Sequence, residues 1–90
     1  MCKKITYTDL EIFGSAGCYP KGTKLRRYSG DFVICHQHFY TDGTMDFHFF
    51  EKTHGYRLDS FTQKQMNDVL DMMKIISENK NEFYPKEFLE

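Results

Sequence analysis

The sequence has no tryptophan, no long apolar run and no recognisable cysteine motif. No apolar stretch approaches the roughly 18 residues from which a membrane-spanning helix is predicted, and no charged-then-apolar leader is present. The three cysteines, Cys2, Cys18 and Cys35, are odd in number, which favours free thiols in a reducing compartment over a disulfide framework. We therefore expect the protein in the cytoplasm, or in the nucleus if the source is a eukaryote.

A large excess of charge of either sign is also missing. The formal net charge is −1, so bulk charge does not point to a nucleic-acid-binding protein. The distribution is uneven, however: residues 1–57 carry eight Lys/Arg and six Asp/Glu, a net +2, whereas residues 58–90 carry four and seven, a net −3. The first part of the chain is mildly basic and the last part acidic.

Aromatic and apolar residues are present in the amounts of one globular domain. The residues are 40% apolar and 28% charged, a composition too hydrophobic for a disordered chain. A length of 90 residues predicts a single domain, residues 1–90. Nine Phe and six Tyr are many for so short a chain. Large rings fill a small core efficiently, and rings outside the core can stack on a ligand, so both uses stay open.

Alternating apolar residues and turn signals predict an antiparallel sheet over about residues 5–58. The expected strands cover residues 5–13, 23–28, 31–41, 44–51 and 56–58, and the first of them is expected to carry a bulge near Asp9. A helical pattern follows over about residues 62–80. The predicted fold class is therefore α+β, with a four- to five-stranded antiparallel sheet followed by one C-terminal amphipathic helix.

The turn at residues 41–43 sets the register of the two longest strands. With Gly43 left-handed in a bulged three-residue turn, Tyr40 pairs with Thr44, and only this register sorts the side chains by polarity. One face, expected to pack on the helix, is nearly all apolar: Val33, Cys35, Gln37, Phe39, Met45, Phe47 and Phe49. The other face, expected to be open, is rich in histidine and has apolar residues at its far end: His36, His38, Tyr40, Thr44, Asp46 and His48, with Phe32, Ile34 and Phe50.

The helix has clear start signals and a wide apolar stripe. Thr62 is predicted to be its N-cap, with Gln65 completing a capping box. Met72 and Ile75 widen the stripe beyond one face, which favours a second packing surface such as a dimer contact. The aromatic tail, residues 83–90, is expected to dock on the domain or on a second copy of the chain.

The histidines offer a weak metal-binding pattern. His36 and His38 share a strand face, and the bulged register puts His48 opposite His36. Asp46 then lies opposite His38. Such a set could bind Zn²⁺ or Fe²⁺, but a solvated face that tolerates histidine is the commoner explanation. We therefore predict no metal and no cofactor, and keep His36, His38 and His48 as the alternative metal ligands.

Catalysis is not indicated by any spacing in the chain. Cys18 lies in a glycine-containing loop, and nothing places a base beside it. The same loop lacks the Lys-Ser/Thr ending of a phosphate-binding loop. The carboxylates are scattered and form no acid–base pair. We therefore expect a protein that is not an enzyme.

A basic cluster is the strongest functional signal. Four cations fall within seven residues: Lys21, Lys24, Arg26 and Arg27. Tyr28 follows them directly. A smaller basic group follows the hairpin: Lys52, His54 and Arg57. Cations that track phosphates, interleaved with rings on which bases stack, are typical of single-strand binders. Cations that protect a solvated strand edge are the alternative explanation.

The order of these features resembles the positive-cofactor-four family of transcriptional coactivators and their bacterial and phage relatives. The resemblance covers about residues 23–77 and starts with the segment KLRRYSGDFVI at residues 24–34. It implies a curved four-stranded sheet, a dimer formed through the C-terminal helices, and single-stranded DNA bound in channels on the sheet. It also implies the roles of basic strand residues for Arg26 and Arg27 and of stacking rings for Tyr28 and Tyr40. Lys52 and Arg57 match the family's basic second loop.

Together these features predict a small non-enzymatic binding module. The first expectation is a homodimer, formed through the helix at 62–80, that binds single-stranded DNA or RNA on the sheet face. The expected contact residues are Lys24, Arg26, Arg27, Tyr28, Tyr40, Lys52 and Arg57. The alternative is a protein-interaction module, such as an inhibitor or regulator encoded by a phage, that uses the aromatic sheet face or the tail to bind a host protein.

Overall fold

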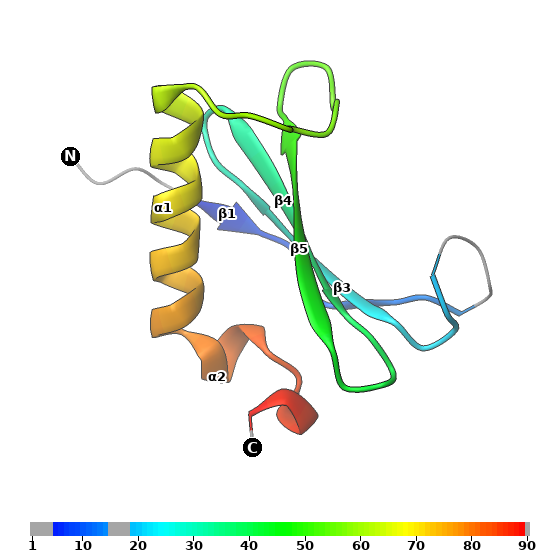
Figure 1. Cartoon of the computed structure of the whole chain (residues 1–90). Helices are drawn as coiled ribbons and strands as arrows, with labels where there is room; N and C mark the ends of the chain where they lie inside the picture. The colour runs from blue at the N-terminus through cyan, green and yellow to red at the C-terminus, as the bar shows by residue number, and fades with distance from the viewer. Residues whose placement is uncertain (1–4, 15–18, 90) are drawn as a thin grey trace.

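An antiparallel sheet precedes a long helix and a short helical tail in the computed structural model, which describes residues 5–14 and 19–89 (Figure 1). The strands are β1 (Thr6–Tyr7), β2 (Glu11–Ile12), β3 (Lys24–Ser29), β4 (Val33–Phe39) and β5 (Met45–Glu51). The helices are α1 (Gln63–Glu78), α2 (Lys80–Phe83) and the 3-10 turn η1 (Lys86–Phe88). The strand order is β1-β3-β4-β5, with β2 also paired to β3, and this confirms the predicted α+β class.

The bulged hairpin turn is confirmed. Gly43 has a φ of 90°, the left-handed conformation that the turn requires. The Tyr40 N–H donates to the Thr44 carbonyl at 2.9 Å, and Phe39 pairs with Met45. This register places His36 opposite His48 and His38 opposite Asp46, as the sequence predicts.

Two predicted strands are shorter than expected. The segment 5–13 forms two separate two-residue strands, β1 and β2, which both pair with β3. The segment 56–58 contributes an isolated bridge between Phe50 and Arg57. That bridge covers one end of β5, because the Glu51 N–H donates to the Tyr56 carbonyl and the Leu58 N–H donates to the Phe49 carbonyl.

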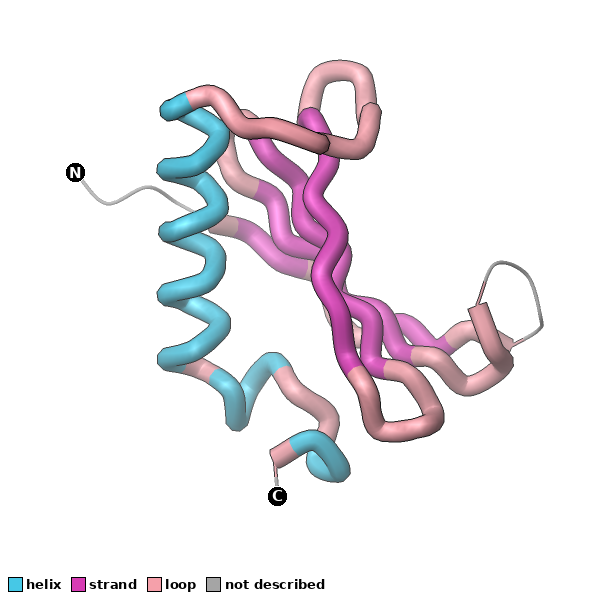
Figure 2. Tube along the Cα trace, viewed as in Figure 1, coloured by secondary structure: helices cyan, strands magenta, loops and turns pink. Residues whose placement is uncertain are grey.

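The core lies between the apolar face of the sheet and α1, which stands on one side of it (Figures 1 and 2). Val33 and Cys35 from β4 pack in one cluster with Met72 and Ile76 from α1, and all four are at most 2% exposed. At about 25 cal/mol per Å² of apolar surface, such burial is the main source of stability. The predicted sorting of the β4 side chains toward the helix is therefore confirmed.

Helix α1 begins with the predicted capping box. The Gln65 N–H donates to the Thr62 hydroxyl, and the Gln65 side chain accepts from the Thr62 N–H. Met72 is fully buried and Ile75 packs against the core, so both residues that widened the apolar stripe are used within the chain. Among the described residues, no helix has the length and apolarity needed to cross a lipid bilayer.

A buried carboxylate on α1 holds the turn between β3 and β4. Asp68 is 0% exposed and accepts from the N–H groups of Phe32 (2.5 Å) and Val33 (3.0 Å). Gly30 lies directly beneath it: a Cβ at this position would lie 2.7 Å from the Asp68 Oδ2 atom. Only glycine therefore lets the carboxylate reach the two backbone donors without a shift of side chain or backbone.

The aromatic tail docks on its own chain. Phe83 in α2 is 2% exposed, and its ring lies edge-on to Tyr7 (4.7 Å between centroids) and Tyr28 (5.4 Å). The Arg26 guanidinium donates to the carbonyls of Phe83 (3.2 Å) and Thr8 (2.6 Å), so one cation joins the tail to the first strands. The sequence predicts docking of the tail either on the domain or on a second copy of the chain, and the structure shows it docked on the domain.

Candidate functional site

The face of the sheet opposite α1 carries the histidines of β4 and β5, with Arg27 from β3 and Asp46 from β5. The register aligns them in rows across the strands. One row runs from Arg27 through His36 to His48, and the next from Leu25 through His38 to Asp46. Further along, Ile34 pairs with Phe50, which in turn bridges to Arg57. We call this surface the histidine face.

One end of the histidine face is covered. The Tyr19 ring stacks on His38 with 4.4 Å between centroids, and Phe13 stacks on Tyr19 in turn at 5.4 Å. His38 is therefore only 1% exposed, and the expectation that this face is open along its whole length is wrong at that position. The other end, around His36 and Phe50, is partly exposed.

A single carboxylate joins three side chains at the covered end. The Asp46 Oδ1 atom lies 3.2 Å from His38 Nδ1, and the Oδ2 atom lies 3.3 Å from His48 Nε2. The Tyr40 hydroxyl also donates to Oδ2, at 2.8 Å. Burial opposes the ionised carboxylate, but these hydrogen bonds and the nearby imidazoles keep the pKa of Asp46 below its ordinary value. Burial and the same carboxylate raise the pKa of Tyr40 to about 12.

Burial holds His36 in its neutral form. Loss of solvent is the largest cause, and the Arg27 cation adds to it, so the pKa of His36 falls from 6.5 to about 4. Burial also lowers the pKa of His38, although the Asp46 carboxylate works in the opposite direction. At neutral pH these rings therefore present a proton-accepting nitrogen rather than a positive charge.

The lowered pKa of His36 predicts a loss of stability in mild acid. Between pH 6.5 and about 4 the unfolded chain binds a proton at this residue and the folded chain does not, so the free energy of unfolding falls as pH falls. Urea unfolding of His36→Gln should depend less on pH in this window than unfolding of the original protein. His54→Gln, which removes a histidine from an exposed turn, is the control. Equal pH slopes for His36→Gln and the original protein would contradict the assignment.

Three of the predicted nucleic-acid contacts do not lie on the histidine face, and two of the three are buried. Tyr28 is 1% exposed in the core, and its hydroxyl donates to Gln37 Oε1 at 2.6 Å, so its ring cannot stack on a base. Arg26 is 6% exposed, and its guanidinium donates a hydrogen bond to the Phe83 carbonyl in the tail. Lys24 lies on the same side of the sheet, where its Nζ atom pairs with Glu87 at 2.7 Å. The physical cause is the alternation of β3, which sends every second side chain toward the helix layer.

The remaining predicted contacts lie on or near the histidine face. Arg27 points to this face with 42% of its side chain exposed, and there it pairs with Glu11. Tyr40 is partly exposed beside Asp46. Arg57 is exposed next to Phe50. The exposed Lys52 donates from its Nζ atom to the Gly30 carbonyl at 2.8 Å, so it sits at the end of the sheet.

The structure selects a different metal-ligand set from the expected alternative. His38, Asp46 and His48 offer ligand atoms that all lie within 4.8 Å of one another, and His36 is not part of this group. The His36 ring turns instead toward Phe50, 4.6 Å away between centroids. Strand alternation correctly predicts that Asp46 and Phe50 lie on this face, but no pattern in the sequence places Tyr19 over His38.

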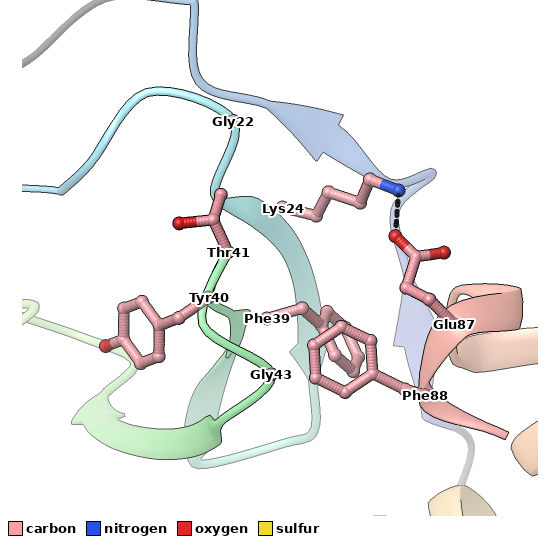
Figure 3. A pocket seen from close by; sticks show the side chains of 8 residues that line it. All are labelled: Gly22, Lys24, Phe39, Tyr40, Thr41, Gly43, Glu87 and Phe88. Atoms are coloured by element: carbon pink, nitrogen blue, oxygen red, sulfur yellow. Dashed lines mark hydrogen bonds and ion pairs between the residues drawn. The ribbon is translucent and has the colours of Figure 1, made fainter. Parts of the chain in front are cut away.

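A pocket of about 320 Å³ lies between the hairpin turn and the tail (Figure 3). It is lined by Gly22, Lys24, Phe39, Tyr40, Thr41, Gly43, Glu87 and Phe88. The Lys24–Glu87 ion pair crosses one side of it, as Figure 3 shows. The pair neutralises the cation there, so the pocket offers no net positive charge to a phosphate.

The candidate site therefore combines a partly exposed ring-and-arginine surface with a carboxylate–imidazole cluster beneath Tyr19. The positions of Arg27, His36, Phe50 and Arg57 define the exposed part. The resemblance to the positive-cofactor-four family stays a prediction. Comparisons of this chain with protein-family models, with curated proteins and with solved structures find no match.

Proposed function

We propose that the protein is a binding module that holds single-stranded nucleic acid on the exposed part of the histidine face. One observation carries the proposal: the rings of His36 and Phe50, 4.6 Å apart, lie between two arginines on the face opposite α1. Rings on a sheet surface accept stacked bases, and flanking cations pair with phosphates. The role is one of binding, without catalysis.

The charges of this surface predict weak binding that depends on salt. Arg27 and Arg57 are on opposite sides of β4 and β5. At the usual strand spacing they are separated by about 14 Å across the strands, and they are also offset by two residues along β5. Glu11 shares the charge of Arg27, and the net charge of −1 gives little long-range attraction. Two phosphate contacts by these arginines correspond to a slope of about −1.4 for log K against log salt concentration, at about −0.7 per contact.

We expect Arg57→Ala to weaken binding of a fluorescein-labelled oligo-dT strand and to halve the salt slope, because one of two phosphate contacts is lost. Phe50→Ala should weaken binding by about 5- to 150-fold, since base stacking on a ring is worth roughly 1–3 kcal/mol. Fluorescence anisotropy at about 50 mM salt measures both.

Lys74→Ala is the matched control for Arg57→Ala, because it removes one exposed cation from α1, far from the histidine face. It should leave both the affinity and the salt slope unchanged. Absence of binding at micromolar strand, or an equal effect of Lys74→Ala, would contradict the proposal.

A protein partner is the second candidate, and the free edge of β5 favours it. The segment 56–58 pairs only with the Phe49–Glu51 end of this strand. Within the described residues, no strand pairs with the edge at Met45 and Phe47. An exposed edge can add a strand from another protein. Such binding would change little with salt, which distinguishes it from a phosphate-dependent ligand.

The dimer through residues 62–80 stays a prediction, with less support than the sequence gives it. Met72 and Ile75 both pack within the chain, so they no longer require a second surface. Leu70 remains 58% exposed on α1. The proposed single-strand binding needs only one chain, because both arginines and both rings come from the same sheet.

A further inference from the structure

We propose that His38, Asp46 and His48 form a binding site for a divalent first-row transition-metal ion of the zinc class. The register brings them together: His38 lies directly opposite Asp46, and His48 is two residues further along β5 on the same face. Two imidazoles and one carboxylate are a common ligand set for such ions. Nothing in the proposed nucleic-acid binding is needed for this site.

The spacing of the three side chains suits a small cation. Their ligand atoms all lie within 4.8 Å of one another. Each imidazole already has a nitrogen 3.2–3.3 Å from a carboxylate oxygen. Adjacent ligands around tetrahedral zinc lie about 3.3 Å apart, given bonds of about 2.0–2.1 Å. Binding therefore requires only a small inward movement of the two rings.

The orientation of the His38 ring decides which of its nitrogens can bind the ion. Its side chain is 1% exposed, yet its Nε2 atom has no hydrogen-bond partner within the described residues. An ion in the cluster would be bound by Nδ1, the nitrogen that lies beside Asp46, and the ring proton would then reside on Nε2. The neutral imidazole that burial favours is also the form that binds metals.

The neighbours of the cluster orient the ligands and leave a route for the ion. The Tyr40 hydroxyl donates to Asp46 Oδ2, and the Tyr19 ring stacks on His38. These contacts restrict the orientation of the carboxylate and of the His38 ring. Asp46 is 43% and His48 20% exposed, so the ion can enter from solvent on their side. Three protein ligands leave a fourth position for water or for a group of a bound ligand.

The test is titration of the full-length protein with ZnCl₂ by calorimetry and with Co²⁺ by visible absorption, where a four-coordinate site gives a distinctive spectrum. We expect one ion per chain. His48→Ala and Asp46→Asn should each weaken binding at least tenfold and remove the Co²⁺ spectrum. Both positions are partly exposed, so these variants should fold, as circular dichroism will check.

His36→Ala is the matched control, since it removes a histidine from the same face but from outside the cluster. It should bind Zn²⁺ as the original protein does. The inference would be overturned by less than one ion per chain or by equal loss in His36→Ala. It would also be overturned by binding that survives in His48→Ala and disappears after alkylation of the cysteines. Oligo-dT binding in EDTA reports on the nucleic-acid proposal separately.

Discussion

Replacement of Asp68 by alanine is expected to lower the free energy of unfolding by about 2–4 kcal/mol. The buried Val33 N–H loses its acceptor, which costs roughly 1–3 kcal/mol, and the partly buried Phe32 N–H loses the same acceptor. The carboxylate accepts from the Phe32 and Val33 N–H groups and is itself fully buried. Its loss also removes the carboxylate that packs directly above Gly30. Urea unfolding followed by circular dichroism measures the change.

Glu78→Ala is the matched control for this prediction. It removes a carboxylate from the same helix at an exposed position, and surface changes of this kind usually alter stability by less than about 0.5 kcal/mol. If Asp68→Ala changed the free energy of unfolding by no more than Glu78→Ala does, the carboxylate would not hold the turn between β3 and β4.

Replacement of Phe83 by alanine should lower the free energy of unfolding by about 3–5 kcal/mol, the usual cost of removing a buried phenylalanine ring. The ring is 2% exposed and contacts both Tyr7 and Tyr28. A domain of this size commonly has about 5–10 kcal/mol of stability, so much of the variant population would unfold on mild heating. Thermal and urea unfolding measure the loss.

Leu70→Ala serves as the comparison, because it shortens an apolar side chain that is 58% exposed on α1. We expect it to change stability by less than about 0.5 kcal/mol. A small effect of Phe83→Ala would mean that the tail separates readily from the sheet. The tail would then be available to a partner, as the alternative function requires.

Local rules were enough to predict the sheet and the helix. Alternation over residues 31–51 and the left-handed Gly43 fixed the hairpin register, and the capping box fixed the start of α1. These features depend on neighbours within a few residues, where backbone geometry leaves few choices. The strand predicted over residues 5–13 is interrupted between β1 and β2, and their registers with β3 differ by one residue, as the bulge predicted near Asp9 requires.

The candidate site was predicted less well because it depends on contacts between distant segments. Alternation alone separates Arg27 from Lys24, Arg26 and Tyr28, so the basic cluster could have been divided between two faces in advance. The burial of Arg26 could not have been predicted in this way, because the carbonyls that its guanidinium contacts belong to Phe83 and Thr8, far away in the sequence. The choice of Asp46 over His36 in the metal cluster likewise depends on side-chain rotation in the folded sheet.

The contacts of Arg26 and Tyr7 have a consequence for synthesis on the ribosome. Arg26 joins Thr8 to Phe83, and the Tyr7 hydroxyl donates to the side chain of Glu82, 75 positions later in the chain. Contacts between such distant segments form only after the cost of closing the intervening loop has been met. During translation the apolar face of the β4–β5 hairpin therefore stays exposed to solvent. The domain can complete its core only after residue 83 has left the ribosomal exit tunnel.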